Sequence, residues 1–112
     1  MDKLTIEWAA GILEGEGSFN IYQRANRPLG SKQCTITCEM TDKDTIYNLR
    51  TALGAGTIAS RGARPNRKPT HILSIQKMEE VFSTLINVMP YLNSRRLARA
   101  KELFNHLEEK CT

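Results

Sequence analysis

The fold is decided by the stretch Trp8-Ala9-Ala10-Gly11-Ile12-Leu13-Glu14-Gly15-Glu16-Gly17-Ser18-Phe19. Its small and aliphatic residues predict a helix that begins at about Leu4 or Thr5 and ends at Glu14, before the glycines that follow. Glu16 then lies just beyond the helix, where unpaired carbonyl groups carry partial negative charge. A carboxylate at that position is disfavoured unless a cation compensates it, so Glu16 is a candidate metal ligand. The alternative is a glycine turn that holds a solvated glutamate.

The residues after this stretch alternate in character. Residues 18–24 and 33–40 place apolar side chains on one side and polar side chains on the other, which predicts a hairpin with one apolar and one polar face. Residues 41–53 keep helical spacing and predict a helix that is capped by Thr41.

The order of helix, Gly-x-Gly and hairpin then recurs. Residues 54–56 end the second helix, and residues 57–61 and 70–76 predict a second hairpin. Ala55 occupies the place that Glu16 has in the first copy. Because a turn needs only its glycines, the acid in the first copy is an addition that favours a functional role.

Two helices are expected to close the chain, over residues 79–89 and 92–108. An apolar stripe on the last helix is interpreted as core, and it consists of Leu97, Ala100, Phe104 and Leu107. The predicted fold class is therefore α+β, in the order α-β-β-α-β-β-α-α. It contains a four-stranded, mostly antiparallel sheet with helices on one face.

Size and composition are those of one ordinary domain, residues 1–112, with 40% hydrophobic and 25% charged residues. No apolar run is long enough to cross a membrane and no secretory signal is visible, so we expect an intracellular protein that is not secreted. Cys34, Cys38 and Cys111 lack the spacing of a zinc site, and buried reduced thiols are the favoured interpretation.

Positive charge is concentrated in the two hairpin regions. The net charge is only +4, but residues 17–38 and 45–78 contain no Asp or Glu. This segregation favours an anion-binding surface, for which nucleic acid is the usual partner. The alternative is an ordinary solvated basic face.

The residues Ala9 to Gly17 resemble the nine-residue LAGLIDADG motif of homing endonucleases, and Ser18 and Phe19 follow as is common in that family. Six letters differ from the motif, but each keeps a small, aliphatic or acidic character. The order of the elements and the sequence Pro90-Tyr91-Leu92 before the last helix fit the family as well.

The resemblance implies a homodimer in which the motif helices of two copies pack together. Gly11 and Gly15 lie one helical turn apart with Ala10 beside them, so two backbones could approach closely. The predicted interface contains Ala10, Gly11, Glu14 and Gly15. Glu14 is also expected to act as a hydrogen-bonding or capping group at the helix junction. The alternative is that this small-residue face packs against the domain's own sheet.

The resemblance also implies a metal site. Two Glu16 carboxylates beside a two-fold axis would hold Mg²⁺, with Mn²⁺ as a substitute, and the Gly15 carbonyl would complete the shell. Asp42 is expected either to order solvent in the active site or to cap the second helix. Arg95 is expected either to stabilise charge at the scissile phosphate or to be a surface arginine.

The polar sheet face is predicted to read double-stranded DNA, since antiparallel ribbons fit the major groove. Candidate base-reading residues are Ser18, Asn20, Tyr22, Arg24, Gln33, Thr35, Thr37, Thr57, Arg61, Thr70, Ser74 and Gln76. Candidate phosphate contacts on the turns are Arg27, Lys32, Arg64, Arg67 and Lys68.

The sequence therefore predicts a site-specific, Mg²⁺-dependent double-strand DNA endonuclease. Two alternatives remain, a DNA-binding regulator that does not cut and an RNA-binding intron maturase. Glu16 argues against the regulator, because a carboxylate near phosphates would hinder simple binding. The sequence does not separate the nuclease from the maturase.

Overall fold

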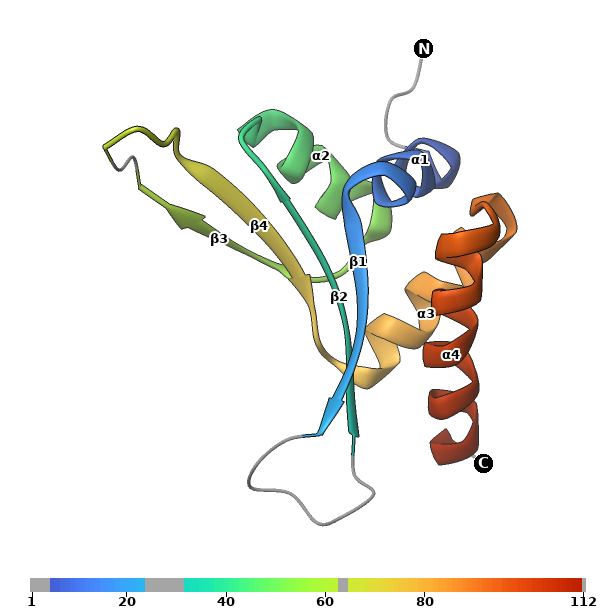
Figure 1. The fold of residues 1–112 in the computed structure, drawn as a ribbon. Coiled ribbons are helices and arrows are strands. Elements are labelled where there is room, and N and C mark those ends of the chain that lie inside the picture. The colour runs from blue at the N-terminus through green and yellow to red at the C-terminus, as the bar shows by residue number, and fades with distance from the viewer. Residues whose placement is uncertain (1–4, 24–31, 63–64, 112) are drawn as a thin grey trace.

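A computed structural model describes residues 5–23, 32–62 and 65–111 of the chain. The elements follow one another as α1 (Ile6–Glu16), β1 (Gly17–Gln23), β2 (Lys32–Met40), α2 (Lys43–Leu53), β3 (Thr57–Arg61), β4 (Thr70–Ile75), α3 (Met78–Val88), a short 3-10 helix (Met89–Tyr91) and α4 (Ser94–Cys111) (Figure 1). Among these residues, no helix is long and apolar enough to span a membrane.

The four strands form one sheet in the order β1-β2-β4-β3, and each of the three strand pairs is antiparallel. The hairpins β1-β2 and β3-β4 are therefore joined through β2 and β4, which lie in the centre. Helices pack on the apolar face of this sheet, and the predicted α+β architecture is confirmed.

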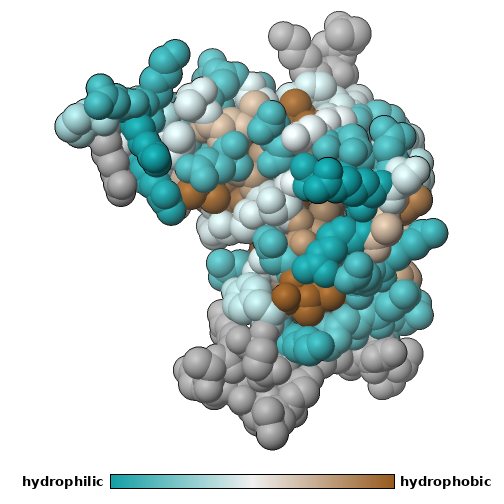
Figure 2. Space-filling view, viewed as in Figure 1, coloured by the Kyte–Doolittle hydropathy of each residue, from teal (hydrophilic) through white to brown (hydrophobic). Residues whose placement is uncertain are grey.

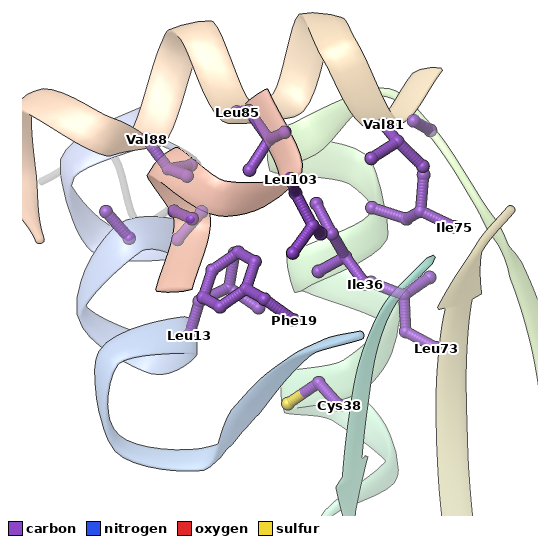
Figure 3. Close-up of a cluster of buried hydrophobic side chains, with 14 of the residues drawn as sticks. Leu13, Phe19, Ile36, Cys38, Leu73, Ile75, Val81, Leu85, Val88 and Leu103 are labelled. Carbon is purple, nitrogen blue, oxygen red and sulfur yellow. The ribbon is translucent and has the colours of Figure 1, made fainter. Parts of the chain in front are cut away.

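The core lies between the sheet and the helices (Figure 3). Phe19 and Ile36 point from β1 and β2 towards Leu13 of α1 and Leu103 of α4. These side chains are at most 4% exposed. The alternation predicted for the first hairpin is confirmed, because Cys34 and Cys38 are buried on the same side as Ile36. Burial of this apolar surface is the main force that holds the sheet to the helices.

The end of α1 differs from the prediction. The helix begins after Thr5, whose hydroxyl accepts a hydrogen bond from the Trp8 N–H at 3.1 Å, as expected for an N-cap. It does not end at Glu14 but continues through Glu16, and Gly17 is the C-cap with an extended backbone. A Cβ at Gly17 would lie 2.7 Å from the Leu13 carbonyl oxygen, so the glycine is needed at this position. Gly15 has no such constraint, and a single glycine does not have to end a helix.

The second Gly-x-Gly segment has a different conformation. Gly54 and Gly56 have φ angles of +69° and +96°, so this is a true glycine turn, whereas Gly15 is helical. The two copies therefore share an order of elements but not a turn. The N-cap of α2 is Asp42 and not the predicted Thr41.

The last two helices also begin and end at residues other than those predicted. Helix α3 ends at Val88, and the 3-10 helix that contains Pro90 delays the start of α4 to Ser94. Leu92, which was expected to begin the helix, is instead buried beneath this connection. In the predicted stripe of α4, Ala100 and Leu107 are buried, while Leu97 and Phe104 are only partly buried. Phe104 stacks on Phe82 of α3 with a ring-centroid distance of 5.1 Å.

Candidate active site and nucleic-acid interface

The C-terminus of α1 meets the N-terminus of α4, and each helix caps the other. The Asn93 N–H donates a hydrogen bond to Glu14 Oε1 at 2.7 Å. In return, Arg96 Nε donates to the Glu14 carbonyl oxygen at 3.1 Å. The arrangement places an acid at the positive end of α4 and a cation at the negative end of α1, which is favourable at both ends. Glu14 therefore acts as a capping group at the helix junction, as predicted.

Arginines from α4 also cover the free edge of β1. Arg96 Nη1 donates to the Gly17 carbonyl oxygen, and Arg99 Nε donates to the Phe19 carbonyl oxygen at 2.9 Å. Arg99 forms an ion pair with Glu102 at 2.6 Å in addition. The two arginines thus supply the donors that a neighbouring strand would otherwise provide.

These roles of Arg96 and Arg99 were not predicted from the sequence. A signal was present in the sequence. Cations in the first turns of a helix are disfavoured by its dipole, so several arginines there require acceptors from another element.

Glu16 is the last residue of α1, and its side chain is exposed. Its charge nevertheless acts on the core. Burial and, to a smaller extent, the nearby negative charge of the Glu16 carboxylate together raise the pKa of the Cys38 thiol to about 11. The carboxylate therefore lies near the end of β2, while remaining open to solvent.

Arg95 is exposed on the first turn of α4. Together with Arg96 and Arg99, it lines an open hollow whose other walls are Ser18, Phe19 and Asn20 of β1. Within the described part of the chain, Arg95 donates to no protein acceptor, so its guanidinium is available to a ligand.

Asp42 occupies the N-cap position of α2, directly after β2. Its carboxylate accepts a hydrogen bond from the Thr45 hydroxyl but from no backbone N–H of the helix. Because Gly17 pairs with Cys38, the start of β1 and the end of β2 lie at the same end of the sheet. The fold therefore brings Glu16, Asp42 and Arg95 to one end of the molecule (Figure 1).

This end of the molecule supplies only some of the ligands that a divalent cation needs. The Glu16 carboxylate and the adjacent Gly15 carbonyl are hard oxygen donors of the kind that Mg²⁺ prefers. However, the described residues contain no group of three or more His, Cys, Asp and Glu side chains that could hold a metal. Mg²⁺ takes about six oxygen ligands, so a cation held by these two oxygens would need further ligands such as waters, phosphate oxygens or oxygens of a second copy.

The face of the sheet away from the helices carries polar side chains in register. One row crosses all four strands, because Thr37 pairs with Ser18 and Ser74, and Ser74 pairs with Thr57. The hydrophilic surface predominates in the view of Figure 2.

The predicted DNA-contacting residues differ in their exposure. The exposed ones are Ser18, Tyr22, Lys32, Thr57, Arg61, Arg67, Lys68 and Gln76. The half-buried ones are Asn20, Gln33, Thr37, Thr70 and Ser74. Arg24, Arg27 and Arg64 lie outside the described residues.

Thr35 is a correction, because it is only 4% exposed and cannot contact a base. Its hydroxyl accepts a hydrogen bond from the Asn20 side-chain amide at 3.4 Å. Beside this pair, the Tyr22 hydroxyl donates to Gln33 Oε1 at 3.0 Å. Thr35 and Gln33 therefore hold the side chains of β1 in place on the polar face.

Sequence reasoning did not select one acid on this face. Glu39 is exposed and pairs with Ile72 of β4. It lines a small pocket with basic side chains from the β3-β4 hairpin, namely Arg61, Arg67 and Lys68. The strict alternation of β2 was the signal, since it places Glu39 on the same face as Thr37.

The exposed side of α1 carries glycine at two positions. Gly11 and Gly15 are exposed, and a Cβ built on either would meet no atom within 4 Å. Ala10, which was predicted to lie on this surface, is 0% exposed and belongs to the core of its own chain. The prediction that Ala10 contacts a partner is therefore wrong. Ala10 is one residue from Gly11, about 100° around the helix, and that rotation turns it inward.

Comparison with known proteins identifies the fold. No family model matches the sequence, and no curated protein matches it either. Among solved structures, the homing endonuclease I-CvuI in complex with its target superposes with a TM-score of 0.77 at 21% identity, over 93% of this chain and 66% of that one. The homing endonuclease I-TnaI gives a TM-score of 0.78 at 20% identity, over 98% of this chain and 75% of that one.

The I-LtrWI LAGLIDADG homing endonuclease bound to target DNA gives a TM-score of 0.76 at 19% identity. It matches over 99% of this chain but only 38% of that chain, whereas the chain spans about two thirds of I-CvuI. The chain thus has the fold of the LAGLIDADG homing endonucleases, and the predicted resemblance is confirmed at the level of fold.

Proposed function

We propose that the protein is a site-specific, divalent-metal-dependent DNA endonuclease that acts as a homodimer, and that residues 1–112 form one domain. The observation that carries the proposal is the exposed Glu16 carboxylate at the end of α1, between an open helix surface and a polar sheet face. Binding to a polyanion alone has no use for a carboxylate at this position, because the carboxylate repels phosphates.

The open surface of α1 supports the homodimer. Each glycine in the interior of a helix costs about 1 kcal/mol relative to alanine. Gly11 and Gly15 carry this cost, and no contact within the described chain requires them to be glycine. A second α1 packed against this surface would use the close approach that they allow. It would also bring the second Glu16 carboxylate that the incomplete metal site lacks.

The metal would be held by Glu16 and the Gly15 carbonyl of each copy and by phosphate oxygens of the DNA. A cation bound there would supply stabilisation of charge on the phosphate and activation of a water molecule. Arg95 would contribute a permanent positive charge to the reacting phosphate from the N-terminus of α4. Asp42 would hold solvent at the same end of the sheet.

The sheet would read the target sequence. The polar row presents hydrogen-bonding side chains in the middle of the sheet. The basic β3-β4 hairpin presents cations at its tip. This division corresponds to base contacts that specify and phosphate contacts that position. The solved complexes of I-CvuI and I-LtrWI with target DNA support a DNA partner.

The decisive experiment compares the wild type with Glu16→Gln on a randomised duplex library, with Mg²⁺ and separately with Ca²⁺. We expect Mg²⁺-dependent cutting at a selected sequence in the wild type. Glu16→Gln should abolish cutting and retain binding, because the neutral amide keeps the shape but loses the charge that attracts a cation.

The matched control is Glu79→Gln, which neutralises an exposed glutamate on α3. It should cut like the wild type. If the wild type binds a selected duplex but cuts with no divalent ion, the protein is a DNA-binding regulator. If it selects structured RNA over every duplex, it is an RNA-binding protein, and either result rejects the nuclease.

A further inference from the structure

We infer that Arg96 is a positioning residue for the metal-binding end of α1, and this inference rests on the proposed function. Its guanidinium donates to the Glu14 carbonyl oxygen at 3.1 Å and also to the Gly17 carbonyl oxygen. These two acceptors lie directly before and directly after the pair Gly15-Glu16. One side chain therefore fixes the main chain on both sides of the residues that would hold the cation.

The segment needs such a restraint. Gly15 has no side chain to anchor it, and a Cβ built there would meet no atom within 4 Å. The backbone then changes from helical to extended between Glu16 and Gly17. A carboxylate flanked by two glycines has a main chain with unusually many accessible conformations. Since a metal site requires ligands held within about 0.5 Å of the productive geometry, some other group has to limit this freedom.

Arg96 is well placed to do so because its own position is fixed. It lies on the first turn of α4, whose start is tied to α1 by the hydrogen bond from the Asn93 N–H to the Glu14 carboxylate at 2.7 Å. The Arg96 side chain is half-buried, so solvent competes less with its two acceptors. The helix junction thus forms a closed loop of hydrogen bonds around Glu14.

The same contacts give hydrogen-bond donors to some carbonyl groups at the end of α1 and leave another one open. The last carbonyls of a helix have no partner within it. The Gly17 N–H takes the Leu13 carbonyl, and Arg96 takes the Glu14 carbonyl. Within the described residues, no side chain donates to the Gly15 carbonyl. Arg96 therefore satisfies the neighbouring oxygens while the Gly15 carbonyl stays open to a hard cation.

Arg99 provides a matched control. It lies one turn further along α4 and donates to the Phe19 carbonyl oxygen at 2.9 Å. It ties the same helix to the same strand by the same kind of bond, but it does not touch the segment that contains Glu16.

The test measures Mn²⁺ affinity in the DNA complex by electron paramagnetic resonance, with uncut duplex under conditions that prevent turnover. The variants are Arg96→Gln, Arg96→Lys, Arg99→Gln and Glu16→Gln in the full chain. DNA affinity without metal and thermal unfolding are measured in parallel. We expect Arg96→Gln to weaken Mn²⁺ binding by about 10- to 100-fold, as is typical when a partner of a ligand is removed.

Arg96→Lys can reach only one of the two carbonyls and should give an intermediate loss, with a higher Mg²⁺ requirement for cutting. Arg99→Gln should keep the Mn²⁺ affinity of the wild type. If Arg96→Gln does not fold, Arg96→Lys decides the question by the same comparison. Wild-type Mn²⁺ affinity in the Arg96 variants, or an equal loss in Arg99→Gln, overturns the inference.

The Glu16→Gln variant distinguishes failure of the Arg96 role from failure of the proposed metal site. If Glu16→Gln loses Mn²⁺ and the Arg96 variants do not, Arg96 is only structural and the proposed nuclease stands. If Glu16→Gln binds Mn²⁺ as well as the wild type, the proposed metal site is wrong, and the role of Arg96 is rejected with it.

Discussion

At the residue scale, the thiol of Cys38 links the core of the protein to the carboxylate at its surface. Burial raises the pKa of Cys38 from the ordinary 9.0 to about 11, and the charge of Glu16 contributes to the increase. The side chain is 1% exposed, so the thiolate has almost no access to water in the folded protein. The neutral thiol is therefore favoured by folding.

This shift predicts a loss of stability at alkaline pH. The unfolded chain releases the Cys38 proton at lower pH than the folded chain does. The stabilisation is therefore complete below about pH 9 and is lost as the pH rises to about 11. Urea unfolding measures the free energy of unfolding of Cys38→Ala and of the wild type from about pH 8 to about pH 11. The value for Cys38→Ala should rise by about 2 kcal/mol relative to that of the wild type over this interval. A constant difference between the two proteins across the interval would contradict the shift.

Single residues also show where sequence reasoning reaches its limit. Glu16 could be selected because a carboxylate among small residues near a helix end is electrostatically unusual. Ala10 and Thr35 were misplaced because periodicity assigns a residue to a face but does not say how much of that face the chain covers. Arg96 was missed because its acceptors are main-chain oxygens of Glu14 and Gly17, distant in sequence.

At the scale of elements, the exposed glycines of α1 have opposite effects on two properties. They lower the stability of the helix, but they would allow the close helix approach that the proposed dimer needs. Gly11→Ala should stabilise the isolated chain by up to about 1 kcal/mol, because alanine is the better helix former and its Cβ meets open space. The same methyl group should hold two α1 helices further apart and weaken the dimer. Sedimentation equilibrium measures the second effect, and urea unfolding of the dilute protein measures the first.

Ser83→Ala on the exposed surface of α3 is the control for this substitution. It should change helix stability slightly and leave association unaffected. If Gly11→Ala associates as strongly as the wild type, α1 does not pack against a second copy through Gly11.

The elements themselves were largely predictable, and their ends were less so. The strand β3 begins and ends at the predicted residues, because alternation bounded by glycine and proline is a local signal. The end of α1 was misjudged at Gly15, because a single glycine does not have to end a helix, and the helical geometry ends only at Gly17, where no Cβ fits. The start of α4 was misjudged because Pro90 begins a 3-10 helix before it.

At the scale of the whole molecule, the proposed function predicts that the basic β3-β4 hairpin sets how strongly DNA binding depends on salt. Each phosphate contact that is lost reduces the slope of log K against log salt by about 0.9. The proposed homodimer would present Lys68 twice, so Lys68→Ala should reduce the slope by about 2 and weaken all duplexes alike. Fluorescence anisotropy with the selected duplex and with a scrambled duplex measures both effects.

Lys101→Ala, which removes an exposed lysine of α4, is the control and should leave the slope unchanged. A Lys68→Ala variant that loses affinity only for the selected duplex would place this side chain on a base edge and not on a phosphate.

The arginines that cover β1 also decide how copies of this chain can associate. An exposed strand edge invites the edge of another molecule, and such pairing leads to fibrous aggregates. Arg96 and Arg99 occupy carbonyls of β1, so this edge cannot accept a further strand. The opposite edge, β3, is only five residues long and ends in the charged residue Arg61, and both features disfavour pairing with a further strand. Both edges of the sheet are therefore protected against pairing with further strands, which disfavours the growth of open fibres at high protein concentration.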